Sequence, residues 1–213
     1  MATITPKKVA LIIASTRGIR VGPNVVDFVH KALLTSPATP KPELSIIDVA
    51  KFNLPVLNER IMPAMVPMYG QFEHEHSKAW SAAMAPFDAY IWVSPEYNFG
   101  VPGGVKNAID YLYNEWIGKP VMIVTYGNQG GNHANDALKK TLSGMKLRVV
   151  ETSPMLKFYP SPDRSELMTA AGQGQIGPKT LELWEQEGKE PLLKGFEELV
   201  ELTETPAPVE KQE

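Results

Sequence analysis

The sequence contains no cysteine. This excludes disulfide bonds, thiolate-bound metals, iron–sulfur ligation and a cysteine nucleophile, and it is compatible with a reducing compartment. The chain also lacks an excess of positive charge, because 21 Lys and Arg residues stand against 24 Asp and Glu residues, for a net charge of -3. Without a basic surplus, we expect binding neither to nucleic acid nor to an anionic membrane surface.

The first residues of the sequence show neither the pattern of a membrane span nor that of a signal peptide. The first apolar run, residues 9–14, is too short to cross a bilayer. The preceding residues 1–8 have no apolar core of the kind found in signal peptides. We therefore expect a cytoplasmic protein with no membrane partner.

The remaining composition is ordinary for a globular protein. Among 213 residues, 43% are hydrophobic and 21% are charged, which is sufficient for the core of one domain. Residues 205–213 are rich in proline and charge and lack an apolar anchor. We predict one domain over residues 1–204, followed by a disordered tail at 205–213.

Apolar strand patterns alternate with helical patterns along the chain. Strands are predicted at 9–14, 43–49, 89–95, 119–127 and 147–153, and helices at 23–34, 75–85, 102–116, 132–146 and 181–203, the last broken near 188–191. The segment 52–70 contains three prolines and no period, which indicates a long loop. Such alternation is typical of a parallel sheet with helices on both faces.

The loop after the first strand has the composition of a phosphate site. Residues 15–22 join an apolar strand to a helix N-terminus and carry the hydroxyls of Ser15 and Thr16 and the guanidinium groups of Arg17 and Arg20. These groups favour a terminal phosphate monoester. The loop has neither a dinucleotide-binding glycine fingerprint nor a Walker lysine. A solvated turn with two surface arginines is the alternative.

The loops after the third and fourth strands favour a flat ligand. Residues 94–104 contain two prolines and three glycines, which fix an irregular path whose backbone groups can meet the edge of a heteroaromatic ring. Tyr97 and Phe99 can cover its apolar parts. Residues 126–132 add three glycines that permit close backbone approach, and Asn128 and Gln129 can pair with ring carbonyls. Taken singly, each loop has an alternative interpretation. Residues 94–104 can be a loop whose aromatic side chains pack inward, and residues 126–132 can be a common glycine-rich turn.

A longer motif makes the interpretation of these loops more specific. The run PEYNFGVPGGVKNAID, residues 95–110, closely resembles the signature of the NAD(P)H-dependent FMN reductase family, whose flavodoxin-like members include quinone, azo-dye and chromate reductases. ASTRGIR at 14–20 resembles the phosphate loop of that family, and GNQGG at 127–131 matches in place. The resemblance covers about residues 9–153.

The resemblance implies a fold, a cofactor and a set of contacts. The fold is a flavodoxin-like three-layer α/β sandwich with a five-stranded parallel sheet in the order 2-1-3-4-5. FMN is the cofactor, and NADPH or NADH is the co-substrate. The implied FMN contacts are Ser15, Arg17, Arg20, Val21, Gly22, Pro95, Glu96, Tyr97, Asn98, Phe99, Gly127, Asn128, Gln129 and Gly130. Two residues depart from the family pattern: Arg20, where many relatives have a hydroxyl residue, and Ala14, where glycine is usual.

The family resemblance also implies a reaction. The flavin takes a hydride from NAD(P)H and passes it to a flavin, quinone, azo compound or similar small-molecule acceptor, which predicts ping-pong kinetics. Neither a catalytic side chain nor a metal is expected, and the assembly implied is a homodimer or tetramer. Two other functions stay open. One is a flavodoxin-like electron carrier without NAD(P)H activity, and the other is a flavin-binding regulatory module that recruits a partner through the residues from Met155 onward.

Overall fold

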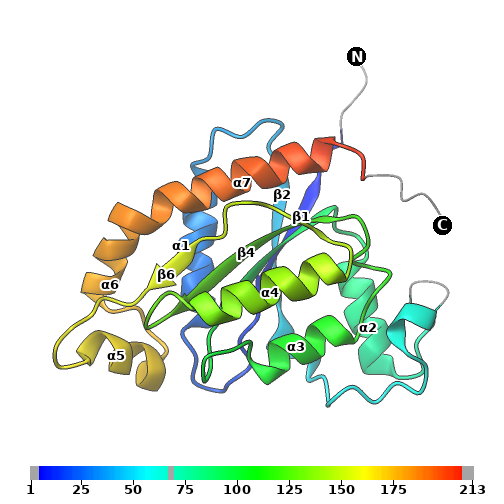
Figure 1. Ribbon diagram of the computed structural model, residues 1–213, viewed down its shortest axis with the longest axis horizontal. Helices are drawn as coiled ribbons and strands as arrows, with labels where there is room; N and C mark the ends of the chain where they lie inside the picture. Colours follow the sequence, from blue (N-terminus) through cyan, green and yellow to red (C-terminus); the bar gives the residue numbers. More distant parts are fainter. Residues whose placement is uncertain (1–4, 67–69, 208–213) are drawn as a thin grey trace.

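A parallel β-sheet forms the centre of the molecule, and helices cover both of its faces (Figure 1). The computed structural model describes residues 5–66 and 70–207. The strands are β1 (Lys8–Ile13), β2 (Glu43–Asp48), β3 (Ala89–Pro95), β4 (Pro120–Gly127), β5 (Arg148–Val149) and β6 (Met155–Lys157). Their order is β2-β1-β3-β4-β5, with β6 also pairing with β4. The predicted order 2-1-3-4-5 is confirmed.

The helices divide between the two faces of the sheet. They are α1 (Gly22–Leu34), α2 (Glu75–Met84), α3 (Gly103–Asp110), α4 (Asn132–Gly144), α5 (Ser165–Gln173), α6 (Pro178–Leu183) and α7 (Lys189–Glu204). Short 3-10 turns lie at Val49–Phe52 and Pro63–Met65, and a π-helical turn lies at Trp184–Gly188. Helices α1 and α7 contribute to one buried cluster, and α2, α3 and α4 contribute to the other.

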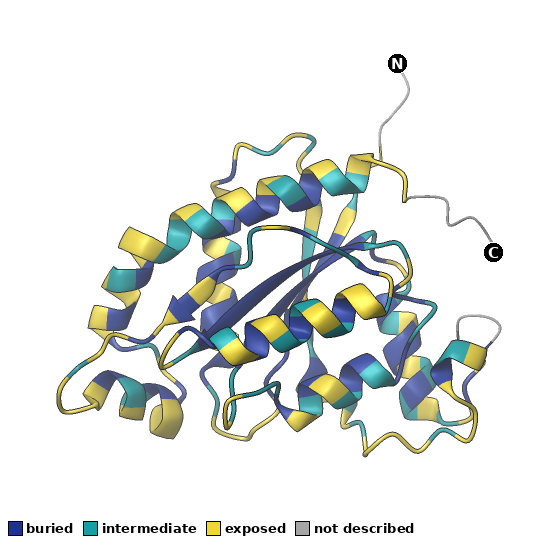
Figure 2. Cartoon of the chain, in the orientation of Figure 1, coloured by how far each residue is buried: buried dark blue, intermediate teal, exposed yellow. Residues whose placement is uncertain are grey.

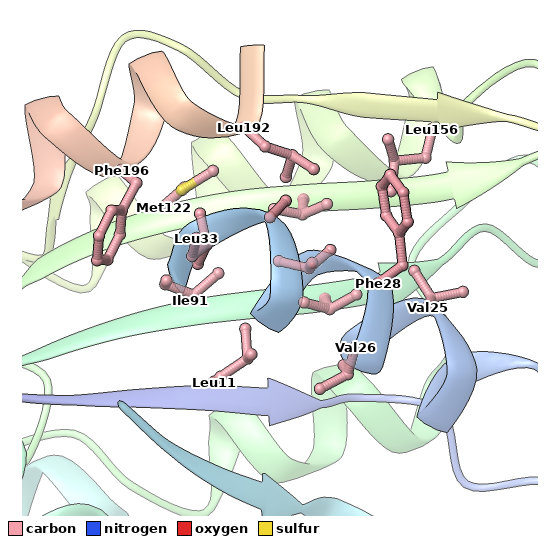
Figure 3. Close-up of a cluster of buried hydrophobic side chains, with 14 of the residues drawn as sticks. Leu11, Val25, Val26, Phe28, Leu33, Ile91, Met122, Leu156, Leu192 and Phe196 are labelled. Carbon is pink, nitrogen blue, oxygen red and sulfur yellow. The ribbon is translucent and has the colours of Figure 1, made fainter. Parts of the chain in front are cut away.

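Two hydrophobic cores follow from the alternation of side chains along the strands. In β1, Val9 and Leu11 face the core under α1 and α7, whereas Ala10 and Ile12 face the core on the opposite side. Figure 3 shows part of the first core, where Phe28 of α1 packs over the sheet. Every residue of β3 is buried, and the central strands are accordingly dark blue in Figure 2. Burial on both faces explains the unbroken apolar runs in the sequence.

The outer edge of the sheet differs from the prediction. The single strand predicted at 147–153 is wrong, because β5 pairs with the start of β4 and the separate β6 pairs with its end. Between them, the Pro154 carbonyl accepts a hydrogen bond from the Thr125 amide at 3.0 Å. Proline has no N–H to donate, so regular pairing resumes only after it.

Two predicted helices also differ from the structure. The helix predicted at 102–116 ends at Asp110. The chain continues in turns, in which Tyr111, Leu112 and Trp116 are all buried. The break predicted near 188–191 is wrong, since α6 continues through the π-helical turn into α7. The wider turn accommodates Pro191, whose missing N–H would interrupt a regular α-helix. Helix α5 was not predicted.

Two further observations concern membrane-spanning helices and the predicted tail. Within residues 5–66 and 70–207, no helix has the length and apolar character needed to cross a membrane. Most of the predicted tail, residues 208–213, lies outside the described residues. At its start, the Thr205 carbonyl accepts a hydrogen bond from Arg148 Nη1 at 2.9 Å.

Candidate functional site

The three loops singled out in the sequence converge beyond the carboxyl ends of β1, β3 and β4. They enclose a pocket of about 250 Å³. It lies where the chain connections leave β1 and β3 in opposite directions, the usual ligand position in an open parallel sheet. The pocket is lined by Arg17, Arg20, Val21, Pro95, Glu96, Tyr97, Tyr126, Gly127, Asn128, Phe158, Leu167, Ala170 and Ala171.

The loop between β1 and α1 presents unused hydrogen-bond donors. None of the backbone N–H groups of residues 16–21 donates to an acceptor within the described chain. Helix α1 starts at Gly22 without a side-chain cap, so its N-terminal N–H groups and positive dipole end remain open. A Cβ on Gly22 would collide with Ser15 Oγ and lie 2.9 Å from the Tyr126 hydroxyl. Glycine is therefore required here by close packing.

The two arginines of this loop have different surroundings. Arg20 forms a bidentate pair with Asp48 at the end of β2, at 2.7 and 3.0 Å, and donates to the Ser15 carbonyl at 2.6 Å. Both side chains of the pair are largely buried. Arg17 is exposed and has no ion pair among residues 5–66 and 70–207; its guanidinium lies 5.2 Å from the centre of the Tyr97 ring. Arg17 is thus the cation available to an anionic ligand.

The loop between β3 and α3 contains a strained two-residue turn. Tyr97 and Gly100 exchange two backbone hydrogen bonds of 3.1 Å. Between them, Asn98 and Phe99 both have positive φ, at 49° and 62°. A bulky aromatic residue rarely adopts this conformation, and such strain concentrates at functional sites. The turn holds Phe99 at the rim, where its side chain is 81% exposed.

Glu96 has a structural partner at the pocket. Its Oε2 accepts a hydrogen bond from the Ala134 backbone N–H at 3.0 Å. Ala134 belongs to the first turn of α4, whose orphan N–H groups favour a carboxylate. Glu96 therefore fixes the β3–α3 loop to α4, and the carboxylate also borders the pocket.

The conformation of the loop between β4 and α4 requires glycine at two positions. Gly130 and Gly131 both have φ of +76°. A Cβ on Gly130 would lie 2.8 Å from the Met155 Cβ, and one on Gly131 would lie 3.0 Å from the Thr125 Cβ. These two glycines thus permit the tight turn beside β6, whereas Gly127 is the one that lines the pocket.

Tyr126 closes the floor of the pocket. Its ring is buried and meets Phe158 edge-on, with ring centres 6.4 Å apart. Burial raises the pKa of the Tyr126 phenol, although the charges of Arg20 and Arg17 act in the opposite direction. The phenol therefore stays protonated at neutral pH and can donate a hydrogen bond.

A second hollow of about 260 Å³ adjoins the pocket and shares Glu96 and Asn128 with it. Its other lining residues are Asn98, Phe99, Gln129, Asn132 and His133. The Phe99 and His133 rings meet edge-on, with centres 5.6 Å apart. The two hollows together form an elongated site, with basic groups at one end and amides with an exposed aromatic ring at the other.

Most of the residues singled out from the sequence meet in these two hollows. The main pocket contains Arg17, Arg20, Val21, Pro95, Glu96, Tyr97, Gly127 and Asn128, and the second hollow adds Asn98, Phe99 and Gln129. Ser15, Gly22 and Gly130 line neither hollow and support the loops from behind. Sequence reasoning missed Tyr126, Phe158, Leu167, Ala170 and Ala171. Only Tyr126 had a local signal, its position directly before Gly127 at a strand end.

The residues present fit FMN. The open amides of 16–21, the start of α1 and the unpaired Arg17 suit a phosphate. Beside them, the walls at 95–97 and 126–128 enclose a pocket with aromatic and backbone surfaces, which suit the apolar faces and polar edges of an isoalloxazine ring.

Comparison with known proteins identifies the family of the chain. Residues 7–160 match the family model described as NADPH-dependent FMN reductase. The chain is 46% identical over 201 residues to the NAD(P)H-dependent FMN reductase ntnL of Nectria sp, covering 93% of this chain and 98% of that protein. It is 30% identical over 148 residues to an Escherichia coli K12 quinone reductase, covering 67% and 66% of the two chains.

A solved structure supports the fold. An archaeal flavodoxin superposes with a TM-score of 0.51 at 12% identity, covering 93% of this chain and 99% of that one. At this identity the likeness concerns the fold, which is the flavodoxin-like α/β sandwich.

Proposed function

The chain belongs to the NADPH-dependent FMN reductase family, and from that premise we propose that the pocket over β1, β3 and β4 is its FMN site. The chain has NAD(P)H-dependent FMN reductase or quinone reductase activity, with FMN and NAD(P)H as its cofactors. The observation that carries the assignment of the site is the unpaired Arg17 beside the open N–H groups of 16–21, at one end of a pocket walled by aromatic and backbone surfaces.

Each loop has its own role in this proposal. Arg17 and the amides of 16–21 bind the phosphate, with Ser15 behind them. Arg20 holds the loop through Asp48, so its contribution to phosphate binding is mainly positional. The backbone at 95–97 and 127–130 orients the ring edges, assisted by the amides of Asn98, Asn128 and Gln129. Tyr126 and Phe158 exclude water from below.

The protein supplies position and electrostatics for the reaction. Bound FMN supplies the hydride-transfer chemistry. The second hollow, with Phe99 and its amide groups, receives the nicotinamide and then the acceptor, which we take to be a quinone, flavin, azo compound or similar small molecule. No side chain has to transfer a proton in the hydride step, and one shared position for donor and acceptor predicts ping-pong kinetics.

A spectroscopic titration tests the proposed function. The purified protein with FMN is mixed anaerobically with NADPH or NADH, and the flavin band near ~450 nm is followed. We expect bleaching, then recovery on addition of a quinone. A bound flavin that neither nucleotide bleaches would support an electron carrier or a regulatory module instead, and failure to bind FMN would overturn the assignment of the site.

We propose that the chain assembles as a homodimer or tetramer. Exposed apolar side chains gather in the loop before α2: Val56, Leu57, Ile61, Met62 and Met65. Such a concentration of exposed apolar groups is typical of an interaction surface, here for a second copy of the chain. Light scattering should give a multiple of the 23.5 kDa chain mass, and Met65→Lys should lower it. A monomer at micromolar concentration would contradict the assembly.

We also propose that residues 1–204 form one FMN-binding domain in the cytoplasm. The continuous sheet and the packing of α7 against α1 and β4 support a single unit, and a need for NAD(P)H supports the location. One cooperative unfolding transition and a cytoplasmic fluorescent fusion are the expected results.

A further inference from the structure

Helix α5 forms a wall of the pocket although it lies outside the family match. The family model ends at residue 160, and α5 spans Ser165–Gln173. Leu167, Ala170 and Ala171 of this helix line the pocket together with Phe158. Figure 1 shows α5 apart from the helices that cover the sheet, at the end of the molecule where β6 and α6 lie. Ala170 is also part of the core under α1 and α7, and Leu167 packs against that core. Helix α5 therefore joins the pocket to the core.

The C-terminal end of α5 is fastened to the phosphate loop. Asn24 Nδ2, on the first turn of α1, donates to the Gly174 carbonyl at 2.7 Å. Gly174 has a φ of +68°, and a Cβ there would lie 2.8 Å from the Arg20 carbonyl oxygen. The residue after α5 thus packs directly on the backbone of the loop that carries Arg17 and Arg20.

The N-terminal end of α5 is fastened to α6. The buried Glu166 carboxylate accepts hydrogen bonds from the backbone N–H groups of Lys179 at 3.3 Å and Thr180 at 2.9 Å. A Cβ on Gly177 would collide with the same carboxylate. Because α6 continues into the long α7, Glu166 connects the wall to the body of the protein.

We propose that α5 retains FMN. This inference rests on the proposed function of the pocket. The helix adds apolar contacts from Leu167, Ala170 and Ala171 and shields one side of the cofactor from water, and its two attachments prevent it from moving away. FMN can leave on this side only after the Asn24–Gly174 attachment opens, so α5 slows cofactor release.

Asn24→Ala tests the attachment without altering the pocket lining. Asn24 is exposed, and the side-chain bond to Gly174 is the contact removed. Asp27→Ala, which removes only an exposed ion pair with Lys31 on the same helix, is the matched control. The readout is the rate at which flavin fluorescence rises when the FMN-loaded protein is diluted. Loss of one hydrogen bond should raise this rate about two- to ten-fold, whereas Asp27→Ala should leave it at the wild-type value.

Two further variants keep the proposal falsifiable. Leu167→Ala removes a wall contact and should also raise the release rate, and Gly174→Ala, which forces the wall away from Arg20, should raise it most. Release at the wild-type rate in Asn24→Ala and Leu167→Ala overturns the role of α5 while the FMN site stands. A wild-type protein that binds no FMN at all overturns the proposed function, and this inference with it.

Discussion

Two arginines three residues apart have separate roles because of one carboxylate. Asp48, at the end of β2, pairs with Arg20 and leaves Arg17 unpaired in the described part of the chain. Charge-assisted hydrogen bonds to phosphate are strong, whereas a buried ion pair mainly fixes geometry and is costly to break from one side. The sequence alone presents both residues as equal candidates for phosphate.

Alanine variants should separate these roles. Arg17→Ala should weaken FMN binding about ten-fold or more with little change in the free energy of unfolding. Arg20→Ala should lower the free energy of unfolding by about 3 kcal/mol, because it leaves the largely buried Asp48 carboxylate without its cationic partner. Fluorescence titration and urea denaturation measure the two quantities. Equal FMN affinity in Arg17→Ala and wild type would remove Arg17 from the phosphate site.

Phe99 is a residue held in a conformation that favours glycine. Its φ of 62° costs about 1 kcal/mol, and the exposed ring recovers little by burial. Phe99→Gly should therefore keep or raise the free energy of unfolding while raising the KM for the acceptor. Steady-state kinetics with a quinone, alongside thermal unfolding, tests this. A variant that is less stable and has an unchanged KM would show that the ring serves the fold.

At the scale of elements, Lys119 joins the start of β4 to the end of α2. Its Nζ donates to the Tyr90 hydroxyl at 2.9 Å and to the Ala85 carbonyl at 3.2 Å. Burial lowers the pKa of Lys119 to about 8, against the opposing effects of Asp88 and Glu115. The folded protein therefore loses this proton at a lower pH than the unfolded chain does.

This difference predicts a rise in stability with pH. Between about 8 and the ordinary 10.5, the unfolded chain holds a proton that the folded protein has released, so the contribution of Lys119 to the free energy of unfolding increases with pH. Below pH 8 both states are protonated and the contribution is constant. Urea denaturation of wild type and Lys119→Met across this range isolates the effect. Parallel pH profiles for the two proteins would contradict the lowered pKa.

At the scale of the molecule, FMN binding and folding should be coupled. The site draws on loops after β1, β3 and β4 and on α5, so it exists only when the whole sheet is formed. FMN at a hundred times its Kd should raise the free energy of unfolding by about 2.7 kcal/mol, or roughly 5–10 °C in Tm for a chain of this size. Riboflavin, which lacks the phosphate, should stabilise less at the same concentration. Equal stabilisation by the two would mean that the phosphate loop contributes nothing.

Local patterns determined most of the fold and the three loops of the site. The apolar runs of β1, β3 and β4 are buried on both faces, and the order of elements leaves few topologies for a parallel sheet. The motif at 95–110 and the loop at 14–20 predicted the family and the cofactor. They could do so because the residues of one short loop appear in the sequence as a contiguous motif.

The tertiary structure decided what depends on residues distant in the chain. The pairing of Arg20 with Asp48 spans two strands, and the division of the last strand depends on which end of β4 each half reaches. The wall at α5 has no motif of its own, since an apolar contact with a pocket needs only a side chain of suitable size. Its role arises from the contacts of Asn24 with Gly174 and of Glu166 with α6, which join residues 13 to 150 positions apart and which no local pattern encodes.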